Sequence, residues 1–96
     1  MTDAPILTEI RGRTGILTFN RPRVMNAFNS ELITATHAAM QDFQSDPAVL
    51  AIVVHGAGRC FSAGFDMKES AAKNITTDAE WRKVLTTDFD FIMQFW

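Results

Sequence analysis

Short apolar runs alternate along this chain with segments of helical periodicity. Residues 6–10 and 16–20 are short and rich in apolar residues, and Gly12 and Gly15 lie in the link between them. Such a link has turn chemistry, so the two runs predict a β-hairpin. Residues 49–54 form a continuous apolar run, VLAIVV, which is typical of a strand buried on both faces.

Helical periodicity first appears after residue 28, where Asn29 or Ser30 is suited to cap a helix. The helix is expected to run to about residue 44, because Asp46 and Pro47 follow, and the residue before a proline disfavours helix. Its predicted core face consists of residues at three- and four-residue spacing: Leu32, Ile33, Thr36, Ala39, Met40 and Phe43.

A second amphipathic pattern opens near Thr77 or Asp78 and continues to the last residue. Its apolar stripe, at helical spacing, comprises Trp81, Val84, Leu85, Phe89, Ile92, Met93 and Trp96. A stripe of that size needs other residues to cover it. We therefore expect this chain to be the first part of a longer protein.

Composition and charge narrow these expectations. Ninety-six residues make at most one domain, and 47% hydrophobic with 21% charged residues is ordinary for a globular protein. A net charge of −2 argues against a general nucleic-acid binder, but it does not exclude a local basic patch for a phosphorylated ligand. The single cysteine, Cys60, fits a reducing compartment. Without an apolar stretch of membrane-spanning length or a leader signature, we expect a cytoplasmic protein that binds no membrane.

The segment from Gly56 to Met67, GAGRCFSAGFDM, joins the predicted strand to a short helical turn at residues 68–73. Asp66 is suited to cap that turn. A strand, a glycine-rich turn and a helix start direct backbone N–H groups to one point, where the helix dipole adds partial positive charge. The segment therefore suits an anion or a developing oxyanion, with a backbone amide as the functional group.

Other chemistry has less support. Gly56 and Gly58 form a GxG without the further residues of a phosphate loop or a dinucleotide motif, which argues against nucleotide hydrolysis and NAD binding. His37 and His55 have no Cys, Asp or Glu at metal-ligand or triad spacing. We predict structural or surface roles for both histidines, and no metal site.

Two motifs together resemble the crotonase superfamily, the enoyl-CoA hydratase/isomerase family. The upstream motif is FNRPRVMNAFN at residues 19–29, and the downstream motif is a GxG followed by FSAGFDMKE, which ends at Glu69. The resemblance runs from about Ile6 to Glu69. It implies an α/β fold, the crotonase-like ββα spiral, with only its first units in this chain. Residues 1–96 are then expected to be the N-terminal part of a single such domain.

The resemblance implies that the Phe65 backbone N–H is one of two donors to the thioester oxygen of an acyl-CoA, which gains negative charge as an enolate-like intermediate forms. The alternative for Phe65 is a core aromatic after a tight turn. Gly64 would let the backbone turn close to the ligand, where a Cβ would intrude. Asp66 is expected mainly as the helix cap, near the ligand. Ala63, through its carbonyl, and Met67 would line the same pocket.

In the upstream motif, the resemblance implies that Arg23 lies near the CoA phosphates and that Met25 contacts the bent CoA. The alternative for Arg23 is a solvated loop arginine. No cofactor is implied beyond the coenzyme A of the thioester substrate. A homo-trimer or hexamer is implied as well, because family members usually assemble as trimers or pairs of trimers.

The resemblance places the general acid and base, and the second oxyanion donor, beyond residue 96. We therefore expect the 96-residue segment alone to be inactive. The favoured activity is that of an enoyl-CoA hydratase/isomerase. The alternatives are another reaction of the same superfamily, by a dehydratase, dehalogenase or CoA hydrolase, and a non-catalytic acyl-CoA-binding protein.

Overall fold

The computed structural model describes residues 4–72 and 77–95 of the chain. These residues divide into two compact units, which meet in the sequence between Gly64 and Phe65. The single domain expected over residues 1–96 stays a prediction.

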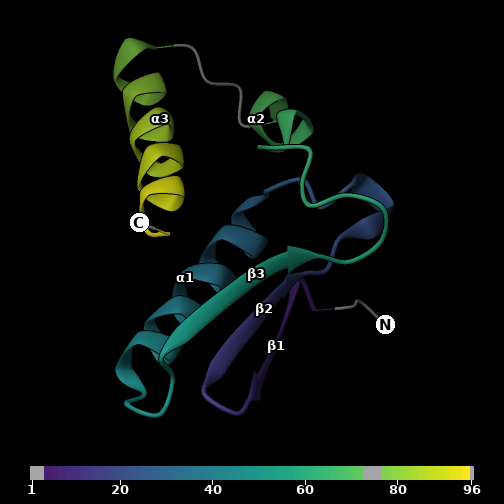
Figure 1. The fold of residues 1–96 in the computed structure, drawn as a ribbon. Coiled ribbons are helices and arrows are strands. Elements are labelled where there is room, and N and C mark those ends of the chain that lie inside the picture. The colour runs from purple at the N-terminus through teal and green to yellow at the C-terminus, as the bar shows by residue number, and fades with distance from the viewer. Residues whose placement is uncertain (1–3, 73–76, 96) are drawn as a thin grey trace. The chain divides into compact units, whose positions relative to one another are not determined.

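The first unit is a three-stranded sheet with one long helix (Figure 1). Strands β1 (Ile6–Arg11) and β2 (Thr14–Phe19) pair antiparallel, which confirms the predicted hairpin. Helix α1 (Ser30–Ser45) then leads to β3 (Ala51–Gly56), which pairs parallel to β2 and gives the sheet order β1-β2-β3. Two parallel strands need such a crossover connection, because a tight turn can join only antiparallel strands.

Helix α1 begins where its cap satisfies the first backbone donors. The Oδ1 atom of Asn29 accepts a hydrogen bond from the backbone N–H of Leu32 at 2.9 Å, so Asn29 rather than Ser30 is the N-cap. The helix ends at Ser45, before Asp46 and Pro47, as predicted.

The core of the first unit lies between β2 and α1. Alternation along β2 turns Gly15, Leu17 and Phe19 toward the helix, and all three are buried. A Cβ added at Gly15 would lie 2.8 Å from the Phe43 ring, so the glycine allows helix and strand to approach closely. The buried residues of α1 match the predicted face except for Ile33, which is half-buried: Leu32, Thr36, Ala39, Met40 and Phe43.

The prediction that residues 49–54 form a strand buried on both faces is wrong for this chain. The strand β3 begins at Ala51, and its residues alternate between exposed and half-buried. Leu50 is 69% exposed and Val53 is 49% exposed. The physical reason is that α1 lies on one face of the sheet, and no described residue of the first unit covers the other face (Figure 1).

The second unit contains α2 (Met67–Ala72) and α3 (Asp78–Met93). Thr77 caps α3, since its Oγ1 accepts a hydrogen bond from the N–H of Glu80 at 3.1 Å. Residue 73, the expected end of the first of these helices, and Trp96 lie outside the described residues. None of the described helices is both long and apolar enough to cross a membrane.

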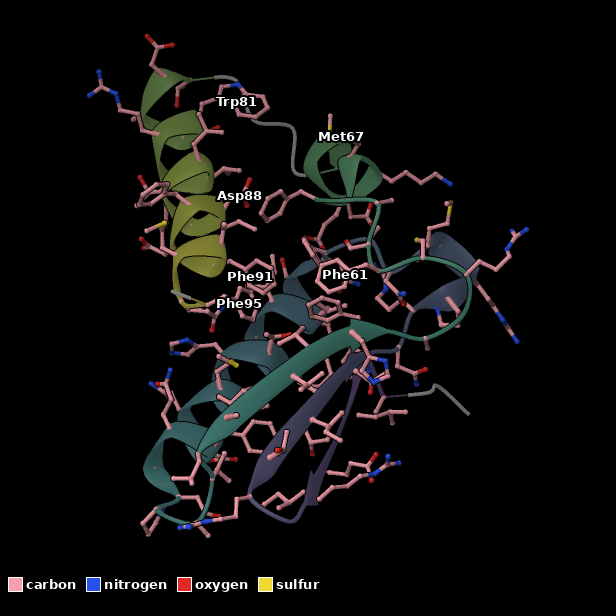
Figure 2. The ribbon with its side chains drawn as sticks, in the orientation of Figure 1. Phe61, Met67, Trp81, Asp88, Phe91 and Phe95 are labelled. Atoms are coloured by element: carbon pink, nitrogen blue, oxygen red, sulfur yellow. The ribbon has the colours of Figure 1, made fainter. Side chains whose placement is uncertain are left out.

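The apolar stripe predicted on α3 is largely solvent-exposed, and its buried aromatic residue is one that the stripe omitted. Phe91 is only 3% exposed, and its ring packs edge to face against Phe65 and Phe95, at centroid distances of 6.1 and 5.5 Å. Figure 2 shows Phe91 and Phe95 at the C-terminal end of the helix. Of the predicted stripe, Val84 is half-buried and the other described members are exposed: Trp81, Leu85, Phe89, Ile92 and Met93.

Candidate functional site

The loop after β2 carries the upstream motif. It contains a short 3-10 helix, η1 (Pro22–Val24), and then Met25 and Asn26, both with positive φ angles of 55° and 56°. The N–H of Asn26 donates a hydrogen bond to the carbonyl of Arg21 at 2.8 Å, which closes the loop. Left-handed backbone at a non-glycine residue is uncommon and occurs most readily at asparagine.

The loop after β3 carries the downstream motif and depends on glycine at its start and its end. A Cβ at Gly56 would lie 2.5 Å from the carbonyl oxygens of Cys60 and Phe61, so only glycine fits where the loop folds back. Gly64 has a φ of +94°, a conformation that L side chains rarely adopt. In the sequence Gly56 is part of an incomplete GxG motif, and its close contacts with Cys60 and Phe61 are visible only in the structure.

The two loops are joined by backbone hydrogen bonds. The N–H of Ala63 donates to the carbonyl of Met25 at 2.8 Å, and the N–H of Phe28 donates to the carbonyl of Gly64 at 2.8 Å. The Sγ of Cys60 also lies 3.3 Å from the Met25 carbonyl. The structure therefore brings together Met25, Ala63 and Gly64, three residues predicted to belong to one site.

Asn26 is the residue that sequence reasoning missed. Its side chain is fully buried, and its Nδ2 donates to the carbonyls of Ala57 and Cys60, both at 2.9 Å. Its Oδ1 accepts from the N–H of Arg21 at 2.8 Å. The signal available in the sequence was an asparagine within a loop, because asparagine tolerates a left-handed backbone conformation and its side chain can form hydrogen bonds to nearby backbone groups.

The peptide group between Gly64 and Phe65 has a defined orientation. The Gly64 carbonyl accepts from Phe28, and the N–H of Gly64 donates to the Oγ of Ser62 at 3.0 Å. A planar trans peptide directs its C=O and N–H to opposite sides. Fixing the Gly64 carbonyl on Phe28 therefore directs the Phe65 N–H away from Phe28.

The structure gives a conformational reason for glycine at position 64, while the predicted close approach of a ligand stays a prediction. No heavy atom of the described residues, apart from its chain neighbours, lies within 4 Å of a Cβ placed there. The structure therefore requires glycine at this position for its φ angle and not for lack of space within the chain.

The remaining candidate residues lie at the surface or at the start of α2. Arg23 and Ala63 are exposed, and Met25 is 53% exposed, so a ligand has access to all three in the first unit. Asp66 caps α2 as predicted, since its Oδ1 accepts from the N–H of Glu69 at 3.1 Å. Met67 is the first residue of α2 and is 75% exposed.

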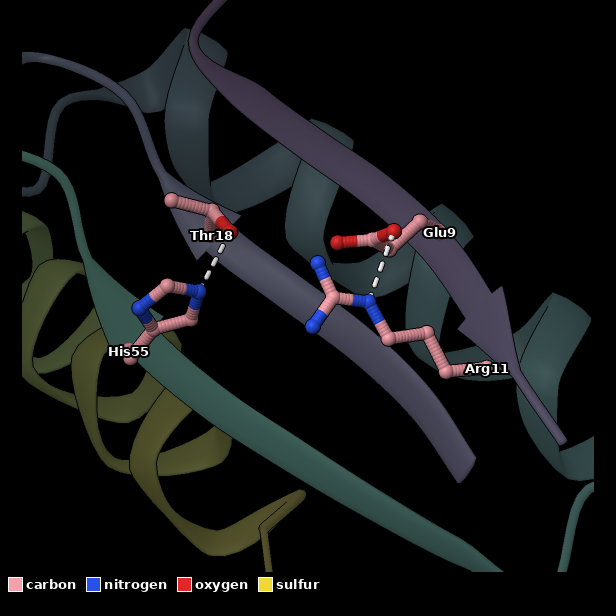
Figure 3. A network of polar contacts seen from close by, with 4 residues as sticks. All are labelled: Glu9, Arg11, Thr18 and His55. Carbon is pink, nitrogen blue, oxygen red and sulfur yellow. Dashed lines mark hydrogen bonds and ion pairs between the residues drawn. The ribbon is translucent and has the colours of Figure 1, made fainter. Parts of the chain in front are cut away.

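Four polar residues on the open face of the sheet form two pairs (Figure 3). The Nε2 of His55 lies 2.7 Å from the Oγ1 of Thr18, and Arg11 forms an ion pair with Glu9 at 3.2 Å. His37 is exposed on α1. Among the described residues there is no cluster of three or more potential metal ligands. The structural or surface roles of the two histidines stay predictions.

Comparisons with known proteins identify relatives over most of the chain. The family model described as enoyl-CoA hydratase/isomerase matches residues 9–95. A probable enoyl-CoA hydratase of Mycobacterium bovis is 37% identical over 89 residues, which cover 93% of this chain and 32% of that protein. The mitochondrial 3-hydroxyisobutyryl-CoA hydrolase of Mus musculus is 35% identical over 81 residues, covering 78% of this chain and 21% of that protein.

A solved structure is similar over nearly the whole chain. The crystal structure of an enoyl-CoA hydratase/isomerase from Xanthobacter autotrophicus Py2 matches with a TM-score of 0.92 at 38% identity. The match covers 99% of this chain and 35% of that chain. The present chain thus spans only about a third of the length of these bacterial proteins.

Proposed function

Because this chain belongs to the enoyl-CoA hydratase/isomerase family, the crotonase superfamily, we propose that it supplies the first part of the active site of an acyl-CoA enzyme. The membership confirms the resemblance found in the sequence, and the likeness to solved structures confirms the α/β crotonase-like fold, of which this chain holds a part. The favoured activity is that of an enoyl-CoA hydratase/isomerase. Its support is that the bacterial relative and the solved structure carry those names.

The proposed catalytic group is the backbone N–H of Phe65. It donates a hydrogen bond to the thioester oxygen, and the bond strengthens as that oxygen gains negative charge in an enolate-like intermediate. One such preset donor lowers the barrier by roughly 3–4 kcal/mol. The observation that carries this proposal is the Gly64 peptide, whose carbonyl is held by the Phe28 N–H at 2.8 Å and whose orientation sets that of the Phe65 N–H.

Coenzyme A would bind along the surface formed by the two loops. The exposed guanidinium of Arg23 is suited to pair with the CoA phosphates, and the exposed Met25 offers an apolar contact. The Ala63 carbonyl would accept from the adenine amine, while Asp66 and Met67 would lie near the pantetheine arm. The substrate brings the only coenzyme that this scheme needs.

The acid–base groups would come from residues outside this chain. Hydration of a double bond requires groups that deliver and remove protons, and glutamates serve this purpose well. Glu31 is exposed in the first turn of α1, and Glu69 lies in the short helix that Asp66 caps. We assign neither to the reaction. The second oxyanion donor, the homo-trimeric or hexameric assembly and a cytoplasmic location belong to the same proposal.

A second candidate function is hydrolysis of an acyl-CoA thioester. The observation that favours it is the 35% identity to the murine 3-hydroxyisobutyryl-CoA hydrolase. An oxyanion donor at Phe65 would serve either reaction, because both add negative charge to the thioester oxygen.

One assay separates the two reactions. The purified full-length protein is mixed with crotonyl-CoA, and two signals are followed: the absorbance of the conjugated enoyl thioester, and free thiol. We expect the absorbance to fall with no thiol released, since hydration removes the double bond and leaves the thioester intact. Thiol release in step with substrate loss would assign the hydrolase reaction instead. Neither signal, with several acyl-CoA substrates, would refute the proposed enzyme.

A further inference from the structure

The side chain of Asn26 forms hydrogen bonds to backbone groups of both motif loops. It donates to Ala57 and Cys60 in the downstream loop and accepts from Arg21 in the upstream loop. It is fully buried, and its own φ of 56° is left-handed. These partners lie in loops, where no sheet or helix ladder satisfies their backbone groups, so their positions depend on the asparagine.

A second contact extends this arrangement to the candidate oxyanion donor. The Oγ of Ser62 donates to the backbone carbonyl of Asn26 at 2.9 Å, and the same Oγ accepts from the N–H of Gly64 at 3.0 Å. A hydroxyl can do both at once, since it has one proton to donate and two lone pairs. Asn26 and Gly64 are thereby linked through one side chain.

Gly64 is held at both of its peptide groups. Its N–H is bound by Ser62, and its carbonyl is bound by the N–H of Phe28, two residues after Asn26. Its φ of +94° would otherwise be one of many conformations open to glycine. The hydrogen bonds to Ser62 and Phe28 therefore select the conformation of Gly64 and, through the planar peptide, the direction of the Phe65 N–H.

We propose that Asn26 and Ser62 are positioning residues, which act through Gly64 to orient the Phe65 N–H toward the thioester oxygen. This inference rests on the proposed function, and it adds two side chains to the backbone contact by which Phe28 holds the Gly64 carbonyl. A hydrogen-bond donor is most effective when it is oriented before the negative charge develops, because reorienting it during the reaction would raise the activation barrier.

The test compares side-chain variants of the purified full-length protein. Each protein is mixed with enough acyl-CoA to fill its binding site, and this ligand carries ¹³C at the thioester carbonyl. Hydrogen bonding to the carbonyl oxygen lowers its stretching frequency, which difference infrared spectroscopy measures for the bound molecule. The informative pair is Ser62→Ala, which removes the hydroxyl, and Ser62→Thr, which retains it. Asn26→Gly removes the amide while allowing the left-handed φ. Phe43→Leu is the control for lost stability alone, because Phe43 packs against Gly15 in the core.

We expect the wild-type protein, Ser62→Thr and Phe43→Leu to lower the carbonyl frequency equally. In Ser62→Ala and Asn26→Gly the bound carbonyl should return toward the frequency of the free thioester. The accompanying fall in kcat should be at least about tenfold, the effect of losing part of one donor interaction worth roughly 1.4 kcal/mol. If Asn26→Gly does not fold, the Ser62 pair decides the question.

Two outcomes would overturn different claims. A wild-type frequency in folded, saturated Ser62→Ala would overturn the positioning role while leaving the proposed function intact. A wild-type protein that binds the thioester without lowering its frequency would overturn the oxyanion donor itself, and with it the proposed function.

Discussion

Replacing Gly64 by alanine adds one methyl group at a position where the structure leaves space but demands an unusual backbone conformation. The φ angle is +94°, and no atom other than those of its chain neighbours lies within 4 Å of the added Cβ among the described residues. An L-residue held in left-handed conformation loses roughly 1–2 kcal/mol. The chain can relieve this strain by changing φ, and that change rotates the peptide which carries the Phe65 N–H.

Gly12 offers a matched control in the turn between β1 and β2. Its φ is +59°, and a Cβ there also meets nothing within 4 Å. Gly12→Ala and Gly64→Ala should therefore lower the free energy of unfolding by similar amounts, about 1–2 kcal/mol each. Urea denaturation measures both values.

The two variants should differ sharply in activity on an enoyl-CoA substrate. Loss of one oxyanion donor lowers kcat by roughly 10²–10³-fold, so Gly64→Ala should approach the lower of these losses while Gly12→Ala keeps the wild-type kcat. Steady-state kinetics of the full-length protein give the comparison. Equal kcat values for the two folded variants would refute the reasoning. The effect of Gly64→Ala would then be a loss of stability through backbone strain, with no change in the orientation of the donor.

Three further substitutions test the packing that supports the site. Gly56→Ala places a Cβ 2.5 Å from two backbone carbonyls; we expect a loss of about 1–3 kcal/mol by urea denaturation, and a stability equal to wild type would contradict the close approach. Leu17→Ala empties a fully buried position in β2, and should cost about 3–5 kcal/mol in the same assay. Asn29→Ala removes the cap of α1 and should cost about 1 kcal/mol, visible as a lower thermal midpoint; Asn29→Ser should restore most of it.

Much of the fold was predictable because its signals are local. The turn glycine Gly12 and the flanking apolar runs indicate the hairpin, and the structure confirms it with β1 and β2 in antiparallel register. Asn29 and the pair Asp46-Pro47 bound α1 by cap and proline chemistry, which act over a few residues. Asp66 could be recognised as the cap of α2 for the same reason.

The misjudged elements depend on contacts between distant residues. A continuous apolar run predicts burial on both faces, but the exposure of Val53 is decided by what covers the sheet. Helical spacing identified a stripe on α3, yet the buried residue is Phe91, outside that stripe, whose ring packs against Phe65 and Phe95. Periodicity measures which residues share a face, and it does not say which face meets a neighbour.

The candidate site divides in the same way. The glycine-rich turn and its resemblance to a known family led to Phe65, Gly64 and the loop residues Arg23 and Met25. Asn26 lies inside the upstream motif, but the sequence indicates no role for it, because its partners Ala57 and Cys60 are more than thirty positions away. A buried amide that links two loops becomes apparent only when both loops are placed in space.

The most direct measurement of the central claim replaces one atom. An amide-to-ester substitution at Phe65, made by semisynthesis, exchanges the backbone N–H for oxygen and leaves the phenyl side chain in place. The ¹³C-labelled thioester carbonyl of the bound acyl-CoA is then compared by infrared spectroscopy in the amide and ester proteins. The account predicts a lowered frequency in the amide protein and a frequency closer to that of free thioester in the ester protein. The same lowered frequency in both would contradict it, because the Phe65 N–H would then contribute nothing to polarising the substrate.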